Sequence, residues 1–174
     1  AFTMAELMED KGKVYAFDLH ENRVKLIRNG AKRLCLKCIE ANTNNGKAFN
    51  ENMPMADKVL CDVPCSGLGV IRRKPEIKYK NPEDFENLPN IQYEILDTSS
   101  KYVKDGGTLV YSTCTLSKAE NDEVVDRFLQ NHKDFKPLEL GKDFPLGKDK
   151  CKITITPDKF NSDGFFIAKF YKMR

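Results

Sequence analysis

Lys58-Val59-Leu60-Cys61-Asp62-Val63-Pro64-Cys65 combines a short apolar run with a cysteine-bearing turn, and the fold can be inferred from this segment. A second segment of the same design, Thr108-Leu109-Val110-Tyr111-Ser112-Thr113-Cys114, follows later in the chain. Short apolar runs bounded by turn residues predict buried parallel strands. In open α/β sheets, ligands bind beyond the carboxyl ends of the strands. We therefore expect two thiols at one ligand-binding edge, an arrangement that indicates covalent chemistry on a bound substrate.

Composition and length indicate a single globular domain. The chain has 174 residues, of which 40% are hydrophobic and 32% charged, values typical of a protein with one sizeable core. Its formal net charge of +3 permits nucleic-acid binding but does not indicate it. No apolar run approaches the roughly 20 residues that span a bilayer, and the first residues lack the features of a secretory signal. We expect a cytoplasmic location, no membrane partner and no obligate protein partner.

The six cysteines are expected to be free thiols, because the chain lacks an export signal. Cys35 and Cys38 form a CxxC pair, which is compatible with half a zinc site or a redox pair. The favoured interpretation is two small apolar residues entering a strand, since a zinc site needs four ligands and the chain has only two histidines and no second CxxC. No metal is therefore expected. A thiol redox enzyme is disfavoured, because neither Cys65 nor Cys114 belongs to a CxxC.

Alternating strand and helix signals predict an α/β fold in which one mixed, mostly parallel sheet has an antiparallel C-terminal edge. Strands are expected at 14–17, 36–41, 58–61, 108–111, 153–155 and 165–170, and helices at 2–9, 22–34 and 91–104. Gly106-Gly107 is expected to stop the last of these helices. Asn81 is expected to cap a further helix, and Ser117-Lys118-Ala119-Glu120 matches a capping box that opens another.

Two further features indicate ligands. Asp18 follows the strand at 14–17, where an acidic residue accepts hydrogen bonds from ribose hydroxyls in nucleotide-binding folds; the alternative is a solvated aspartate at a strand end. A loop of five cations within nine residues is a candidate phosphate-binding patch, and the alternative is an ordinary solvated loop. Its cations are Arg72, Arg73, Lys74, Lys78 and Lys80.

The paired cysteine motifs resemble those of the Sun family of RNA 5-methylcytosine methyltransferases. The resemblance rests on Asp62-Val63-Pro64-Cys65-Ser66-Gly67 and on Ser112-Thr113-Cys114-Thr115. It is supported by residues 69–78, by Ala119-Glu120-Asn121 and by residues 163–168. The loop at 69–78 is most similar to the bacterial branch that acts on 16S ribosomal RNA. The resemblance implies a Rossmann-like fold of the class I S-adenosylmethionine-dependent methyltransferases.

The resemblance also implies a role for each cysteine. Carbon 5 of cytosine is a poor nucleophile until a thiolate attacks carbon 6. By resemblance, Cys114 is this nucleophile and Cys65 assists release of the product. A thiol of ordinary pKa, about 8.5, needs help to ionise. The start of the helix expected after Ser117 is a candidate source of a favourable dipole.

Cofactor and RNA contacts follow from the same resemblance. S-adenosylmethionine is the implied cofactor, held by Asp18, by Asn45 near the adenine, and by Asp62 and Pro64. Asp62 is also placed to accept a hydrogen bond from the exocyclic amine of cytosine. The implied partner is RNA, specifically small-subunit ribosomal RNA, contacted by Arg72, Arg73, Lys74 and Lys78.

The family carries a Pro-Gly-Gly-Lys loop after its first strand, which would precede the helix that contains Met4. The sequence starts at Ala1-Phe2-Thr3-Met4, so we expect residues 1–174 to be an N-terminally incomplete catalytic domain. A methyltransferase is the leading hypothesis. The alternative is a catalytically silent module that binds RNA or protein on the same fold, although pure binding requires neither cysteine.

Overall fold

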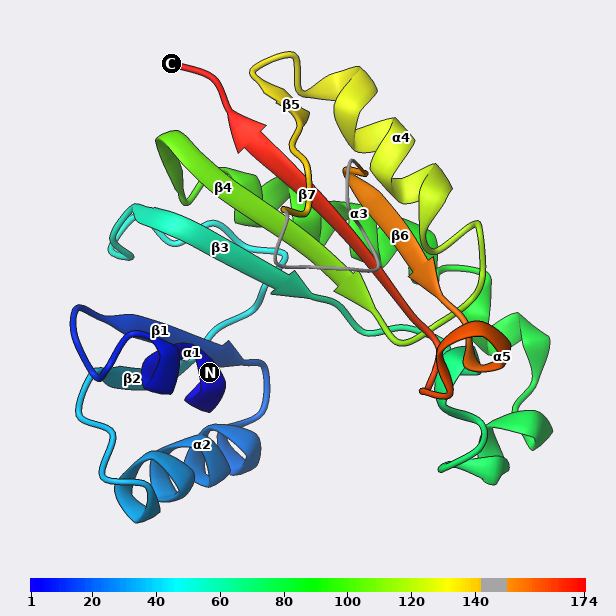
Figure 1. Ribbon diagram of the computed structural model, residues 1–174, viewed down its shortest axis with the longest axis horizontal. Coiled ribbons are helices and arrows are strands. Elements are labelled where there is room, and N and C mark those ends of the chain that lie inside the picture. The colour runs from blue at the N-terminus through cyan, green and yellow to red at the C-terminus, as the bar shows by residue number, and fades with distance from the viewer. Residues whose placement is uncertain (142–149) are drawn as a thin grey trace. The chain divides into compact units, whose positions relative to one another are not determined.

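The computed structural model describes residues 1–141 and 150–174. These residues form two compact units, Ala1–Ala48 and Phe49–Arg174, which we describe separately. Both units combine helices with strands (Figure 1). Within the described residues, no helix is long and apolar enough to cross a membrane.

The first unit is a parallel strand pair with two helices. Its elements are α1 (Phe2–Leu7), β1 (Val14–Asp18), α2 (Glu21–Arg33) and β2 (Ile39–Thr43). Strands β1 and β2 are parallel, and Asp18 lies opposite Thr43. Helix α2 buries Val24 and Ala31, which lie seven residues apart and therefore share one helical face.

A carboxylate fixes the start of β2. Asp10 accepts hydrogen bonds from the backbone N–H groups of Lys37 and Cys38, at 2.8 and 2.7 Å. These hydrogen bonds lower the pKa of Asp10, because they favour the charged carboxylate. The contact orders the segment before Ile39, so β2 starts later than the strand predicted at 36–41.

The second unit contains a five-stranded sheet with the order β3-β4-β7-β5, and β6 pairs with β7 outside this path. The strands are β3 (Ala56–Asp62), β4 (Val103–Thr113), β5 (Phe135–Pro137), β6 (Lys152–Ile155) and β7 (Phe165–Lys172). Strands β3 and β4 are parallel, whereas β7 is antiparallel to β4, β5 and β6. The predicted mixed α/β fold with an antiparallel C-terminal edge is thereby confirmed (Figure 1).

Helices α3 (Leu88–Ser100) and α4 (Asp122–Asn131) pack against each other and bury apolar side chains against this sheet. Alternate residues of β4 and β7 point into this core. Leu96, Leu109 and Phe128 are fully buried there. The core holds the carboxyl ends of β3 and β4 in place.

Short helices make up much of the remaining chain of this unit. Three are 3₁₀ turns, Leu68–Val70, Pro75–Tyr79 and Pro82–Phe85, and the fourth is α5 (Pro157–Phe160). The predicted cap at Asn81 is confirmed, since its side chain accepts a hydrogen bond from the N–H of Glu83 at 3.2 Å. The helix that it caps is one 3₁₀ turn.

Two local predictions are wrong. Helix α3 ends at Ser100, and Gly106-Gly107 lies inside β4. Val103 is β-branched and fully buried, and it pairs with Ala56 of β3, so burial in the sheet prevails over continuation of the helix. The φ of Gly106 is 78°, a conformation that glycine adopts without strain, and the register of β3 and β4 shifts beside it.

The second error is the capping box at Ser117. Helix α4 starts at Asp122 with Asn121 as its N-cap residue. Glu120 is buried and accepts hydrogen bonds from Ser66 and Gln92 instead of from the backbone of Ser117. The dipole that the prediction placed beside Cys114 therefore starts several residues further along the chain.

Candidate active site

Two cysteine-bearing turns meet beyond the paired strands β3 and β4. Asp62 and Ser112 lie opposite each other in the parallel ladder, so the turns that follow them leave the sheet at the same edge. The sulfur atoms of Cys65 and Cys114 are 3.2 Å apart, and the N–H of Cys114 lies 3.3 Å from the Cys65 sulfur. A disulfide bond would bring the sulfurs to about 2.05 Å. Both residues are half-buried free thiols, in contact through a hydrogen bond.

The two thiols are not equivalent. Burial raises the pKa of Cys65, and the hydrogen bond to Cys114 raises it further. Both effects favour the neutral thiol of Cys65. This neutral thiol can donate its S–H to the Cys114 sulfur, and a donated hydrogen bond stabilises a thiolate. The two thiols can therefore take different parts in their contact, Cys65 as the donor and Cys114 as the acceptor.

A close backbone contact holds the turn that contains Cys114. The N–H of Gly69 donates to the carbonyl oxygen of Cys114 at 3.0 Å, and the N–H of Gly164 donates to the carbonyl of Gly69 at 2.7 Å. A Cβ atom added to Gly69 would lie 2.1 Å from the Gly164 oxygen. Only glycine fits there, so the loop after Cys65 and the turn before β7 both support Cys114.

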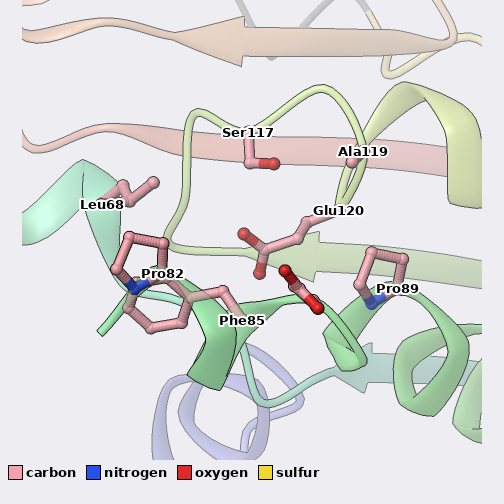
Figure 2. A pocket seen from close by; sticks show the side chains of 8 residues that line it. Leu68, Pro82, Phe85, Pro89, Ser117, Ala119 and Glu120 are labelled. Atoms are coloured by element: carbon pink, nitrogen blue, oxygen red, sulfur yellow. The ribbon is translucent and has the colours of Figure 1, made fainter. Parts of the chain in front are cut away.

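A buried carboxylate lies behind the two turns. Glu120 is 3% exposed and accepts hydrogen bonds from the residues that follow each cysteine, Ser66 and Thr115. It also lines a cavity of about 240 Å³ whose walls include Leu68 and Phe85 (Figure 2). This role of Glu120 could not be predicted from its local sequence, because its position after Ser117 matches a helix cap. The sequence feature that points to Glu120 is the segment Ala119-Glu120-Asn121, one of those on which the resemblance to the methyltransferase family rests.

The predicted residues Asp62 and Pro64 both lie just before Cys65 in the second unit. The Asp62 carboxylate accepts a hydrogen bond from the Ser112 hydroxyl at 3.2 Å, and its side chain is exposed. The carbonyl of Pro64 accepts from the Gln92 amide at 2.9 Å. Asp62 thus offers an exposed carboxylate three residues before Cys65, and Gln92 fixes the backbone at Pro64.

Asp18 and Asn45 belong to the first unit. The Asp18 carboxylate accepts from the N–H of His20 at 2.9 Å, and a guanidinium nitrogen of Arg23 lies 3.5 Å away. The carbonyl of Asp18 accepts from the N–H of Asn44, the neighbour of Asn45, at 3.0 Å. Both predicted residues therefore lie at the carboxyl ends of β1 and β2, where an acidic and an amide side chain suit a nucleoside.

The cations of the predicted patch fall into two groups, arginines that face a buried carboxylate and lysines with exposed side chains. Arg73 forms an ion pair with the buried carboxylate of Asp163, and a nitrogen of Arg72 lies 3.8 Å from the same group. In the described part of the chain, no ion pair involves Lys74 or Lys78, whose side chains are exposed. The two lysines therefore offer positive charge to a partner, whereas the arginines also compensate a buried carboxylate.

Cys35 and Cys38 do not form a symmetric pair. Cys35 is exposed with a φ of 55°, whereas Cys38 is buried against Ala5 and Val14. Among residues 1–141 and 150–174, no group of three or more His, Cys, Asp or Glu side chains is arranged to hold a metal ion.

Comparison with known proteins places this geometry in context. Residues 2–171 match the family model described as 16S rRNA methyltransferase RsmB/F. The probable ribosomal RNA small subunit methyltransferase B of Bacillus subtilis is 47% identical, over 97% of this chain and 40% of the relative. The ribosomal RNA small subunit methyltransferase F of Serratia proteamaculans is 32% identical, over 97% of this chain and 37% of the relative. The chain thus spans about 40% of the length of these relatives.

Solved structures give the same picture. The crystal structure of PH0851 superposes with a TM-score of 0.89 at 33% identity, covering 97% of this chain and 39% of that one. NSun6 from Pyrococcus horikoshii, solved with SFG, superposes with a TM-score of 0.84 at 31% identity, covering 99% of this chain and 44% of that one.

Proposed function

The chain belongs to the 16S rRNA methyltransferase RsmB/F family, and on that premise we propose that it is the catalytic region of an S-adenosylmethionine-dependent enzyme that methylates carbon 5 of a cytosine in small-subunit ribosomal RNA. The observation that carries the proposal is the 3.2 Å separation of the Cys65 and Cys114 sulfurs at the carboxyl edge of β3 and β4. A module that only binds RNA or protein needs neither thiol.

Cys114 acts as the nucleophile in this proposal. Its sulfur bonds to carbon 6 of the cytosine, and the electron pair of the 5,6 double bond moves to carbon 5. The electron-rich carbon 5 then accepts the methyl group. Water takes the carbon 5 proton, the electron pair of that C–H bond restores the double bond, and the Cys114 sulfur leaves as a thiolate. Cys65, in contact with that sulfur, assists this release.

The cofactor supplies an electrophilic methyl group when bound. The donor set of the chain fits it: Asp18 is suited to the ribose hydroxyls and Asn45 to the adenine edge, and Asp62 is suited to the methionine end or to the exocyclic amine of the cytosine. Asp18 and Asn45 lie together at one strand edge of the first unit, where the Asp18 side chain is 22% exposed. Each of these groups accepts hydrogen bonds, which matches the hydroxyl and amine donors of the ligands.

The RNA backbone is assigned to the loop between Cys65 and α3. Lys74 and Lys78 lie on it, and their exposed ammonium groups suit phosphate contacts. The target cytosine must leave any base stack to reach a pair of half-buried sulfurs, so we expect an unpaired or flipped-out base as substrate.

Direct analysis of the methylated product tests this function. The gene-encoded protein is incubated with S-adenosylmethionine and small-subunit ribosomal RNA, and the RNA nucleosides are then analysed by mass spectrometry. We expect 5-methylcytidine with the wild-type protein and none with Cys114→Ala. A methyl group on another base or another atom, or full activity of Cys114→Ala, would overturn the proposal.

A further inference from the structure

Glu120 lies at the centre of the hydrogen bonds that join the two cysteine turns. It precedes α4, is 3% exposed, and contributes to the wall of the cavity that Leu68 and Phe85 also line (Figure 2). Its own carbonyl accepts a hydrogen bond from the buried hydroxyl of Tyr111 at 2.6 Å. The backbone of Glu120 is therefore anchored to β4, which leads into Cys114.

All the hydrogen bonds of its carboxylate come from neutral donors. One oxygen accepts from the N–H of Ser66 at 2.8 Å and from the amide of Gln92 at 2.9 Å. The other accepts from the hydroxyls of Ser66 at 2.6 Å and Thr115 at 3.3 Å. A carboxylate accepts at both oxygens, whereas a carboxamide accepts at only one. In the described residues no ion pair to a cation compensates this buried group, so its burial carries a cost that needs a reason.

These partners flank the cysteines. Ser66 directly follows Cys65, Thr115 directly follows Cys114, and their hydroxyls lie 2.8 Å apart. Gln92, which donates to Glu120, also donates to the carbonyl of Pro64 on the other side of Cys65. The segment that carries Cys65 is thus fixed on both sides by groups that depend on one carboxylate.

Cys114 has additional support. It directly follows β4, and its two neighbours are both held by Asn121, which accepts from the Thr113 hydroxyl at 2.6 Å and donates to the Thr115 carbonyl at 3.0 Å. Loss of the Glu120 carboxylate should therefore displace Cys65 more than Cys114. Because Cys65 should move more than Cys114, loss of the carboxylate should impair release, the role of Cys65, more than attack, the role of Cys114.

We propose that Glu120 is a positioning residue that holds the Cys65 thiol against the Cys114 sulfur, so that the covalent intermediate is released. The inference rests on the proposed function. In that reaction Glu120 supports the release of the Cys114 sulfur from the base, and not the initial attack of that sulfur on the base. A displacement of about 1 Å at a reacting group can slow a step about 100-fold, so the effect is large enough to measure.

Glu120→Gln in the gene-encoded protein is the sharpest test. It keeps the shape of the side chain and replaces one carboxylate oxygen, a hydrogen-bond acceptor, by an NH₂ group, a donor. Its new NH₂ would face either the N–H groups of Ser66 and Gln92, which cannot accept, or two hydroxyls that now donate to Glu120 and would have to turn to accept. We expect kcat to fall about tenfold or more, the KM for RNA not to rise, and a protein–RNA adduct to accumulate on denaturing gels. Glu123→Gln is the matched control: it makes the same change on the exposed first turn of α4, and should turn over like wild type without adduct.

The adduct distinguishes positioning from general damage. A distorted site would lose attack and release together, whereas the positioning role predicts attack without release. Turnover equal to that of Glu123→Gln, or loss of both turnover and adduct, would overturn the inference. If Glu120→Gln does not fold, Ser66→Ala removes a single hydroxyl donor and must give the same adduct, to a smaller extent. Wild-type protein that forms no 5-methylcytidine would overturn the proposed function itself, which is a separate outcome.

Discussion

The sulfur atoms of Cys65 and Cys114 lie 3.2 Å apart, although 49 positions separate the two residues in the chain. Two parallel strands produce this relationship, because Asp62 and Ser112 are paired and each cysteine follows within a few residues. At this distance the thiol of one cysteine can hydrogen-bond to the sulfur of the other while that sulfur is bonded to a substrate.

The two thiols should give opposite phenotypes when removed singly. Cys65→Ala leaves the Cys114 sulfur able to attack but slows its release, so we expect a protein–RNA adduct that survives denaturing electrophoresis. Cys114→Ala should give no adduct and no methylation. An adduct in Cys114→Ala and none in Cys65→Ala would mean that the roles are exchanged.

Asp18 should contribute to cofactor affinity. Asp18→Asn replaces a charged acceptor at the end of β1 by a neutral amide, and hydrogen bonds to charged groups are about twice as strong as neutral ones. We expect a rise of about tenfold in the dissociation constant of S-adenosylmethionine, measured by calorimetry on the gene-encoded protein. Glu21→Gln is the control, since Glu21 is an exposed acid of the same unit paired with Arg28. Equal affinities of the two variants would remove Asp18 from the cofactor site.

The cations of the loop should behave in two ways. Lys78→Ala should weaken RNA binding and reduce the salt dependence of the binding constant by about one counterion. Arg73→Ala should reduce that salt dependence less, because its partner Asp163 already offsets its charge. It should instead lower the free energy of unfolding by about 1 kcal/mol, because the Arg73 side chain is largely exposed and Arg72 still faces the buried Asp163 carboxylate.

Fluorescence anisotropy of labelled RNA over a range of salt concentrations measures the first effect, and thermal unfolding the second. If Arg73→Ala reduces the salt dependence of RNA binding more than Lys78→Ala does, the different roles given to arginines and lysines of this loop are contradicted. Lys74→Ala should resemble Lys78→Ala.

Alkaline pH should destabilise the second unit through Cys61. Burial raises the pKa of this thiol from 9.0 to about 12. The unfolded thiol ionises from about pH 9 and the folded thiol only near pH 12, so the free energy of unfolding decreases as the pH rises through this window. Cys61→Ala should make that decrease shallower, whereas Cys35→Ser, at an exposed cysteine, should not. Denaturant unfolding between pH 8 and 11 measures both slopes, and parallel slopes in all three proteins would contradict the prediction.

The strands at Val59 and Leu109 were predictable because apolar runs bounded by turn residues have few alternatives. The end of α3 was not predictable, since Val103 suits either a helix face or a strand until its pairing with Ala56 is known. Cys65 and Cys114 carry a sequence motif, whereas Glu120 acts through Ser66 and Gln92, which are 54 and 28 positions away. Contacts of that range leave no local pattern, and Ser117 offered a local partner that the folded chain does not use.

Strand β7 is the last strand of the described residues, yet it lies inside the sheet between β4 and β5. A nascent polypeptide whose residues 165–172 are still within the ribosomal exit tunnel cannot complete that sheet, and Gly164, which holds the Cys114 turn through Gly69, has not yet taken its place. The turn that carries Cys114 therefore gains its full set of contacts only after Gly164 and β7 have been made.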